Sequence, residues 1–278
     1  MNLDKPTVQE KRAAFRRLHE SGCFLLPNPW DLGSARYLQS LGFKALATTS
    51  SGFAWSKARA DGSVNRDHVL EHFREMAQGC ELPINADFEH GFADDEAGVA
   101  ESVRLAVETG VAGLSIEDAT GNPERPLYDF EVALARVRAA RVSIDRTGSG
   151  ALLVARAEGI LLGRSSLEEV VARLKAFAGA GADCLYAPGL RTAEQIAAVV
   201  EAVSPKPVNV LVGWDSELTL DRIAALGARR ISVGGALARC AWQGFMRAAR
   251  QLAEQGSFRG FADAASGSEL NSLFIGDS

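Results

Sequence analysis

The sequence predicts a (β/α)8 barrel, a ring of eight parallel strands that alternate with helices. Short apolar segments typical of buried strands alternate with helical patterns along the 278 residues. One junction, in which a helix ends in glycine and a buried strand follows at once, recurs four times. No GxGxxG fingerprint follows any strand, which disfavours a doubly wound sheet as the alternative. The length and the 47% content of hydrophobic residues suit one large α/β domain.

The recurring junction places glycine directly after a helix, where the left-handed backbone conformation costs this residue little. The glycines concerned are Gly42, Gly110, Gly181 and Gly227, and each precedes an apolar run. Such a repeat is hard to obtain in an all-α or an all-β fold. It therefore indicates repeated helix-to-strand connections, as in a barrel of βα units.

Eight strands are expected in order along the chain. They begin near Cys23, Phe43, Leu82, Val111, Ala151, Asp183, Pro207 and Arg229. The clearest helical patterns between them cover Asp67–Gly79, Glu96–Thr109, Phe130–Ile144, Ser166–Ala178, Thr192–Val203 and Leu218–Leu226. A further helix, Leu32–Ser40, follows Asp31, which is a suitable N-cap. A basic helix, Val8–His19, precedes the first strand and is expected to pack on the outside.

The end of the chain differs from the βα units. After the eighth strand, Ala236–Glu254 is expected to form a long amphipathic helix, and residues 256–278 are polar and rich in glycine. We expect this tail to pack on the body or on a neighbouring subunit through its apolar anchors, Phe258, Phe261, Leu270, Leu273 and Phe274. No linker divides the chain. We interpret residues 1–278 as a single barrel domain with a helical extension from about residue 236.

Composition excludes several classes of protein. The net charge of −5 gives no reason to expect nucleic acid or a membrane surface as a partner. No apolar run approaches the roughly 20 residues that span a bilayer, and the first residues lack the apolar core of a signal peptide. The four cysteines are isolated, which fits a reducing, cytoplasmic location and core packing rather than disulfides or zinc.

Charged side chains follow three adjacent predicted strands. Asp87 and Glu89 end one strand, Glu117 ends the next, and Arg156 ends the third. Because the carboxyl ends of barrel strands meet at one face, we expect these side chains to form one site. Carboxylates so close would repel each other, and Mg²⁺ or Mn²⁺ would suit them as hard oxygen ligands. The Arg156 guanidinium would offer a planar fork to a substrate carboxylate.

Two later strands carry further candidates at the same position. Tyr186 and Asn209 end the sixth and seventh strands, and we expect them to line the pocket.

These motifs resemble a known family. The runs Asn85-Ala-Asp87-Phe-Glu89-His-Gly91 and Ser115-Ile-Glu117-Asp118, the turn Ser51-Gly52-Phe53, and Arg156 are similar in order and spacing to the isocitrate lyase / phosphoenolpyruvate mutase superfamily. The resemblance covers about residues 7–250. It implies a (β/α)8 barrel whose last helix is often exchanged between subunits, so a homo-oligomer is expected. It also implies chemistry on C–C or C–P bonds beside an α-oxo acid carboxylate, with Mg²⁺ or Mn²⁺ and an enolate-like intermediate.

The resemblance also implies roles for individual residues. Asp87 matches the acid that contacts the metal most directly, and Glu89 and Glu117 match acids that hold metal-bound waters. Asp61 matches an acid on the loop after the second strand. The backbone of Ser51, Gly52 and Phe53 matches the turn that holds the oxo-acid carboxylate, and Arg156 matches the arginine that contacts the substrate.

The loop after Glu117 departs from the family pattern. Isocitrate and methylisocitrate lyases carry a Lys-x-Cys-Gly-His loop here, whereas residues 119–130 contain neither cysteine nor histidine. Asn122 falls close to a gate asparagine of the mutases and phosphonopyruvate hydrolases, but the flanking lysine is absent. Gly121, Pro123 and Pro126 argue against a helix. We expect a mobile gate, in which Arg125 could bind a distal substrate carboxylate.

Three functions stay open at this point. The first is a metal-dependent C–C lyase on a small 2-oxo or 2-hydroxy dicarboxylate, such as oxaloacetate decarboxylation or a methylisocitrate-like cleavage. The second is a C–P bond enzyme of the phosphoenolpyruvate mutase or phosphonopyruvate hydrolase type. The third is an oxo-acid-binding barrel without turnover. Decarboxylation is the least demanding of these, because it needs an electron sink but no dedicated acid on the loop.

Overall fold

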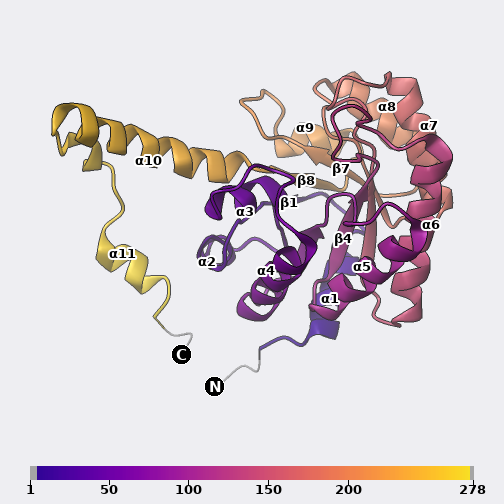
Figure 1. Ribbon diagram of the computed structural model, residues 1–278, viewed down its shortest axis with the longest axis horizontal. Coiled ribbons are helices and arrows are strands. Elements are labelled where there is room, and N and C mark those ends of the chain that lie inside the picture. Colours follow the sequence, from indigo (N-terminus) through magenta and orange to yellow (C-terminus); the bar gives the residue numbers. More distant parts are fainter. Residues whose placement is uncertain (1–4, 276–278) are drawn as a thin grey trace.

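The computed structural model describes residues 5–275. Eight parallel strands form one sheet in the order β1-β8-β7-β6-β5-β4-β3-β2. At the seam between β1 and β2, the Ala47 amide donates to the Pro27 carbonyl at 3.0 Å, so the barrel is nearly closed. The predicted (β/α)8, or TIM, barrel is confirmed (Figure 1). The strands are β1 (Phe24–Leu26), β2 (Leu46–Ala47), β3 (Ile84–Asp87), β4 (Gly113–Glu117), β5 (Leu152–Arg156), β6 (Cys184–Tyr186), β7 (Val208–Leu211) and β8 (Arg230–Ser232).

The helices follow the predicted alternation closely. Most begin after a Ser, Thr, Asp or Asn that caps the first turn; Asp31, for example, accepts the Ser34 amide at 2.7 Å, as predicted. Three short helices, α3, η1 and α11, were not predicted. The helices are α1 (Val8–Leu18), α2 (Leu32–Ser40), α3 (Ser50–Ser56), α4 (Arg66–Gly79), α5 (Glu96–Glu108), α6 (Phe130–Arg146), α7 (Leu167–Gly179), α8 (Ala193–Val203), α9 (Leu220–Ala225), α10 (Ala236–Gln255), η1 (Arg259–Phe261) and α11 (Gly267–Ser272).

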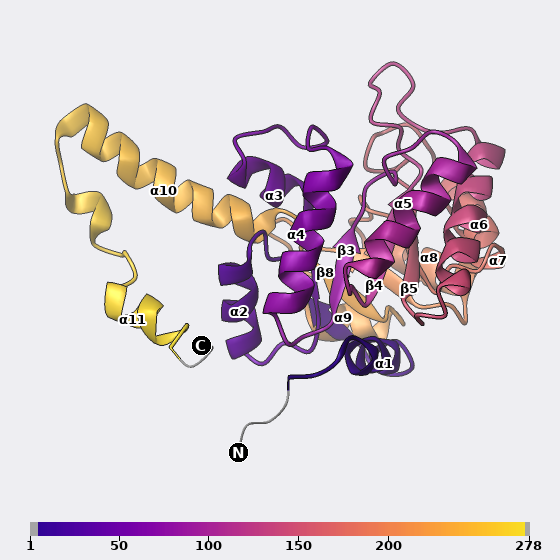
Figure 2. The ribbon, with the colours of Figure 1, turned by 60° about the horizontal axis from the view of Figure 1, so that its bottom comes forward.

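Helix α1 packs on the outside, as predicted, and it does so at one end of the barrel, beneath the strands (Figure 2). Phe15 is fully buried, and its ring stands 3.0 Å from the place where a Cβ on Gly113 of β4 would lie. Two basic side chains of α1, Lys11 and Arg12, are buried too, because they reach backbone carbonyls near the C-terminal ends of α4 and α5. Lys11 donates to Ala77 O at 2.8 Å and Arg12 to Val107 O at 2.7 Å.

Helix α10 leaves the barrel after β8 and projects away from it in both views (Figures 1 and 2). Of its residues only Ala238 is buried, whereas Trp242, Phe245 and Met246 are exposed. The tail then returns toward α2, where the Phe274 ring lies 3.9 Å from the position of a Cβ on Gly33. Within residues 5–275 no helix combines the length and the apolar character needed to cross a bilayer.

We predict that the exposed face of α10 is covered by another subunit in a symmetric homodimer or homotetramer, with the tetramer as our expectation. Light scattering at micromolar concentration should therefore give a mass above that of the 29.6 kDa chain. Phe245, which is 63% exposed, is the residue to test. Phe245→Asp should lower the mass, whereas Val132→Asp, at an exposed position on α6, should not. A monomeric unmodified protein would contradict this prediction.

Candidate active site

The strand register brings the predicted residues into one row. Glu117 is paired with Arg156, Arg156 with Tyr186, and Tyr186 with Asn209. The row continues from Asn209 to Arg230 on β8, which was not among the predicted site residues. Five adjacent parallel strands, β4 to β8, therefore present polar or charged side chains at matched positions.

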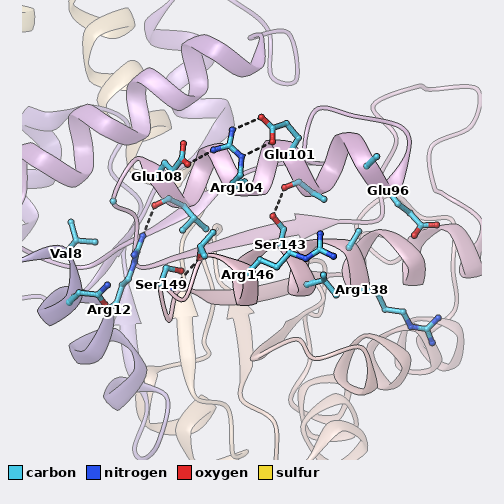
Figure 3. A pocket seen from close by; sticks show the side chains of 18 residues that line it. Val8, Arg12, Glu96, Glu101, Arg104, Glu108, Arg138, Ser143, Arg146 and Ser149 are labelled. Atoms are coloured by element: carbon cyan, nitrogen blue, oxygen red, sulfur yellow. Dashed lines mark hydrogen bonds and ion pairs between the residues drawn. The ribbon is translucent and has the colours of Figure 1, made fainter.

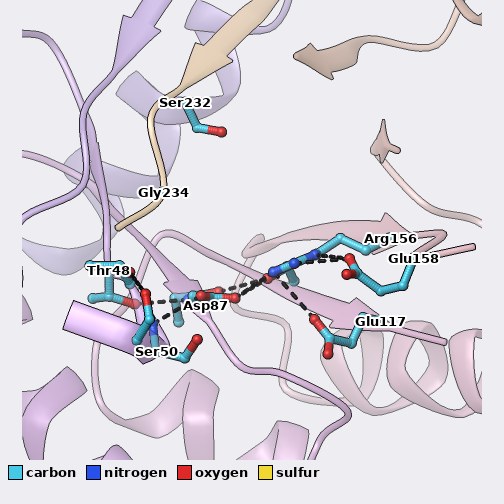
Figure 4. Close-up of polar contacts among 12 residues, drawn as sticks. Thr48, Ser50, Asp87, Glu117, Arg156, Glu158, Ser232 and Gly234 are labelled. Carbon is cyan, nitrogen blue, oxygen red and sulfur yellow. Dashed lines mark hydrogen bonds and ion pairs between the residues drawn. The ribbon is translucent and has the colours of Figure 1, made fainter. Parts of the chain in front are cut away.

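Arg156 is the hub of the site (Figure 4). Its Nη1 lies 2.8 Å from Asp87 Oδ1 and 3.3 Å from Glu117 Oε2, and its Nη2 and Nε each lie 2.9 Å from Glu158 Oε1. The guanidinium also stands 4.8 Å from the centre of the Tyr186 ring. One cation thus joins carboxylates from the ends of β3, β4 and β5.

Asp87 is fixed by its neighbours on β2 and α3. Its amide donates to Thr48 Oγ1 at 2.8 Å, and its Oδ2 accepts the Ser50 amide at 3.0 Å. Ser50 is the first residue of α3, where helical amides have no partner within the helix. The helix that was not predicted therefore supplies one of the groups that orient the predicted carboxylate.

Glu89 lies just beyond β3 with a positive φ of 49°, which is uncommon for a residue with a side chain. Burial and the charges of Asp87 and Asp61 raise the pKa of Glu89 to about 8. Asp61 lies on the loop after α3, and partial desolvation and the charge of Asp87 raise its pKa as well. Burial is the largest cause of both shifts, and the charge of the neighbouring acids adds to it.

The raised pKa of Glu89 predicts a pH dependence of stability in the metal-free protein. Between the ordinary pKa of about 4.3 and about 8, the folded state holds a proton on Glu89 that the unfolded state has lost. Stability should therefore fall as pH rises through this range. Glu89→Gln should weaken this dependence of stability on pH. With chelator present to remove metal ions, the substitution should raise the melting temperature more at pH 8 than at pH 5. An equal shift at both pH values would contradict the assignment.

The acidic groups of the site fit a hard divalent cation that is bound partly through water. Among the described residues, no three acidic, histidine or cysteine side chains converge closely enough to surround an ion directly. The carboxyl groups of Asp87, Glu89 and Glu117 nevertheless lie at or just beyond the carboxyl ends of β3 and β4, and Arg156 contacts two of the three. Oxygen ligands that act partly through water are typical of Mg²⁺. The residues therefore fit an ion held directly by Asp87, with the other two acids reaching it through water.

The turn Ser51-Gly52-Phe53 forms part of α3. The Gly52 amide donates to Thr49 Oγ1 and the Phe53 amide to Thr49 O, so both are used in capping. The Phe53 side chain stacks on His72, with ring centroids 3.9 Å apart. Ser51 lines the same cavity as Asp87 and Arg156. Of the three predicted positions, the structure thus leaves Ser51 the best placed to contact a bound carboxylate.

Tyr186 and Asn209 are both buried in the row. Burial raises the pKa of Tyr186 to about 12, so its hydroxyl stays neutral. Asn209 accepts from Arg230 Nε and donates to Ser232 Oγ, both at 2.9 Å. Arg230 is 3% exposed and also donates to Asn85 Oδ1 at 3.3 Å. These contacts make the floor of the cavity polar and hold Asn209 in place.

The loop after β4 is non-helical, as predicted, and forms a small hairpin. Ala119 and Leu127 form an antiparallel bridge, and Thr120 N donates to Pro126 O at 3.0 Å. The Asn122 side chain accepts the Glu124 amide at 2.9 Å. Asn122 and Arg125 lie exposed at the tip, so neither contacts the Arg156 hub in this conformation.

Besides Arg230, three residues with contacts at the site were not among the predicted site residues: Glu158, Thr48 and Asn28. Glu158 contacts Arg156 directly, and this contact depends on the turn after β5. Thr48 orients Asp87, and Asn28 accepts the Val233 and Gly234 amides at 2.9 Å while it donates to Thr48 O. A single Asn or Thr at a strand end carries no charge signal, so the sequence offered little to find them.

A cavity of about 160 Å³ lies at this end of the barrel. Its lining includes Asp87, Arg156, Tyr186, Ser51 and Arg230. A larger groove of about 1030 Å³ lies elsewhere, between α1, α5 and α6 (Figure 3). Three of its charged groups are paired with one another on a single helix: Arg104 pairs with Glu101 and Glu108 on α5. The groove therefore lacks the convergent polar groups that the barrel cavity has.

Comparison with known proteins agrees with this geometry. The family model described as phosphoenolpyruvate phosphomutase matches residues 15–253. Oxaloacetate decarboxylase of Pseudomonas putida (strain GB-1) is 28% identical over 242 residues, covering 84% of this chain and 82% of that protein. A putative lyase/mutase from Burkholderia cenocepacia J2315 has a crystal structure with a TM-score of 0.92 and 45% identity, over 96% of this chain and 97% of that one. A structure of oxaloacetate acetylhydrolase with the product oxalate gives a TM-score of 0.86 at 26% identity, over 97% and 95%.

Proposed function

This chain belongs to the phosphoenolpyruvate phosphomutase family, and on that premise we propose that it is a Mg²⁺- or Mn²⁺-dependent lyase that cleaves a C–C bond of a small 2-oxo dicarboxylate. Oxaloacetate, with loss of carbon dioxide, is the substrate that we favour. Relatives named oxaloacetate decarboxylase and oxaloacetate acetylhydrolase support the substrate class.

One observation carries the proposal. Arg156 stands among three carboxylates at the carboxyl ends of β3, β4 and β5, while the neighbouring loop of residues 119–128 offers no cysteine, histidine or lysine. The site thus has a fixed positive charge for an oxyanion, but its loop carries none of the cysteine, histidine or lysine side chains that would serve as acid or nucleophile. Decarboxylation suits such a site, because the leaving group departs as carbon dioxide without a proton.

The roles of the residues follow from their positions. Arg156 would donate to the carboxylate or 2-oxo oxygen of the substrate and stabilise the negative charge that develops there as the C–C bond breaks. Ser51 would hold the carboxylate, and Tyr186 would line the pocket. Asn209, predicted to line it, is instead buried behind the lining, where it holds Arg230 and Ser232 in place. A divalent ion held by Asp87, and through water by Glu89 and Glu117, would supply further positive charge at the 2-oxo oxygen.

A C–P bond enzyme remains the second candidate, because the matched family model is that of a phosphomutase. Asn122 on the loop tip is the residue that favours it. A barrel that binds oxo acids without turnover is the third candidate.

One panel of assays separates the three candidates. Purified protein with Mg²⁺ or Mn²⁺ is given oxaloacetate, methylisocitrate or phosphonopyruvate, and pyruvate and phosphate are measured. We expect pyruvate from oxaloacetate, abolished by chelator. Asp87→Asn at the same metal concentration serves as the blank for spontaneous metal-catalysed decarboxylation. Phosphate from phosphonopyruvate would favour the C–P enzyme, and oxalate binding without any turnover would favour the binding protein.

Arg125 tests whether the loop of residues 119–130 acts as a gate. The residue is exposed at the loop tip, and on closure its guanidinium could pair with a distal carboxylate. We predict that Arg125→Ala lowers kcat/KM on a dicarboxylate by about 10-fold or more, because a charge-assisted hydrogen bond contributes about 1.5–3 kcal/mol. A monocarboxylate oxo acid should be affected far less. Equal losses on both substrates, or none, would show that the loop is only a connection.

A further inference from the structure

Asp118 is a buried carboxylate next to the active site, and its contacts connect three elements that support the site. Asp118 follows Glu117 directly and is 2% exposed. Its Oδ1 accepts the Glu158 amide at 2.7 Å, and its Oδ2 lies 3.2 Å from Nη1 of Arg173 on α7. The end of β4, the turn after β5 and helix α7 are thereby tied to one side chain.

Arg173 extends this connection to the far end of the hairpin loop. Its second nitrogen, Nη2, donates to Tyr128 O at 3.0 Å, and the Tyr128 amide donates to Asp118 O at 2.9 Å. Residues 118 and 128 are thus held side by side by one guanidinium and one backbone bond. The tip, residues 121–125, is exposed beyond this fixed base.

Tyr128 connects the same base to the loop after β3. Its hydroxyl donates to Asp94 Oδ1 at 3.1 Å, and its ring lies 4.0 Å from the guanidinium of Arg136. Arg136, 1% exposed, donates to Ala93 O and Asp94 O at 2.6 and 2.7 Å and also to His90 O. That loop carries Glu89, so the three active-site loops after β3, β4 and β5 share one set of contacts.

We propose that Asp118 and Arg173 are positioning residues, which hold the base of the 119–127 loop and the Arg156–Glu158 contact in the geometry that turnover requires. The physical reason is that Glu158 lies two residues beyond the end of β5. The hydrogen bond from its backbone amide to the Asp118 carboxylate holds the turn in which the Glu158 side chain points back toward Arg156. Neither residue faces the cavity or could touch substrate. The activity part of this proposal rests on the proposed function, whereas the geometric part does not.

A matched pair exists at the opposite end of the barrel. Asp183, before β6, accepts the Leu153 amide at 2.8 Å and pairs with Arg141 of α6 at 2.9 Å through the same oxygen. The arginines are similarly exposed, 13% for Arg173 and 16% for Arg141. In both pairs an aspartate accepts a backbone amide from the β5 segment and is paired with an arginine on a helix. Only the Asp118–Arg173 pair lies at the active-site face of the barrel. Arg141 is therefore a control for loss of an ion pair as such.

The test compares Arg173→Met with Arg141→Met in the full-length protein. For Arg173→Met we expect kcat to fall about 10- to 100-fold, the range seen when groups that orient ligands are removed, with KM little changed. Amide hydrogen exchange in residues 118–130 and 157–160 should rise about 10-fold or more. Arg141→Met should lower stability less, because Asp183 keeps Arg16 at 3.6 Å, and should leave kcat nearly unchanged.

The conservative variant Arg173→Lys keeps the charge but cannot bridge two acceptors as a guanidinium does. In this variant we expect amide hydrogen exchange to stay slow at residue 158 and to become fast across residues 119–128. Arg173→Lys also provides a test if Arg173→Met does not fold. Equal losses of kcat in the Arg173 and Arg141 variants, or unchanged exchange in the loop, would overturn the proposal. If no substrate is turned over, the proposed function fails, while the exchange pattern still decides on the positioning role.

Discussion

Asp87→Ala should abolish metal-dependent binding of an oxo acid while the barrel still folds. In the proposed site Asp87 is the direct ligand of the ion, and its Oδ1 also orients Arg156. Removal of groups that merely support a metal ligand typically costs about 10- to 100-fold in metal affinity or activity, so loss of the ligand itself should cost more than about 100-fold. Calorimetry with oxalate and Mg²⁺ measures this directly.

The fold should survive because several effects on stability oppose each other. Without Asp87, the Ser50 amide loses its acceptor, which costs about 1–3 kcal/mol if no water replaces it. Arg156 keeps Glu117 and Glu158 as partners, and the charge that raises the pKa of Glu89 is relieved. Asp87→Asn separates charge from hydrogen bonding, since it keeps an acceptor for Ser50. Oxalate affinity unchanged in both variants would refute the role of Asp87.

The architecture could be predicted because it depends on local signals that repeat. Gly42, Gly110, Gly181 and Gly227 all have positive φ between helix and strand, as the junctions predicted. Asp87, Glu117 and Arg156 were found together because parallel strands align their carboxyl ends, so three charges at three strand ends must share one face. Neither inference needed knowledge of long-range packing.

Helix α3 could not be predicted because its stability comes from tertiary packing. Its sequence, Ser50 to Ser56, contains two poor helix formers, serine and glycine, in its first turn. Gly52 fits because a Cβ there would stand 2.9 Å from the Cβ of Trp30 and 3.2 Å from that of Ala238. The close approach of two distant segments selects glycine at this position, and a local pattern does not report it.

The role of Arg230 was missed for a related reason. Arg229 and Arg230 are consecutive, and in a strand neighbouring side chains point to opposite faces. Arg229 lies just before β8 and donates to the Gly22 carbonyl, whereas Arg230 enters the barrel and bonds Asn209 and Asn85. A pair of arginines is normally read as solvated surface. Only the register of β8 shows which of the two is buried.

Arg156→Lys should fold and yet lose most of its turnover. Lysine keeps the positive charge, so the buried carboxylates of Asp87, Glu117 and Glu158 are not left without a cation. An ammonium group cannot, however, reproduce the planar fork whose nitrogens contact all three carboxylates at 2.8–3.3 Å. Loss of one preorganised donor to a developing oxyanion typically costs about 100- to 1000-fold in kcat, and we expect a loss in that range.

Arg156→Met removes the positive charge, and its main expected effect is a lower free energy of unfolding. Three partly buried carboxylates would then face each other without a cation, and breaking a buried ion pair on one side costs about 3–5 kcal/mol. Urea unfolding should show this loss at pH 7, and it should shrink at lower pH as the raised pKa of Glu117 lets that carboxyl take up a proton.

The two variants together separate the roles of Arg156. If Arg156→Lys kept more than a tenth of the wild-type kcat, the guanidinium would be a counter-ion for the acids and not the group that stabilises the reacting oxygen.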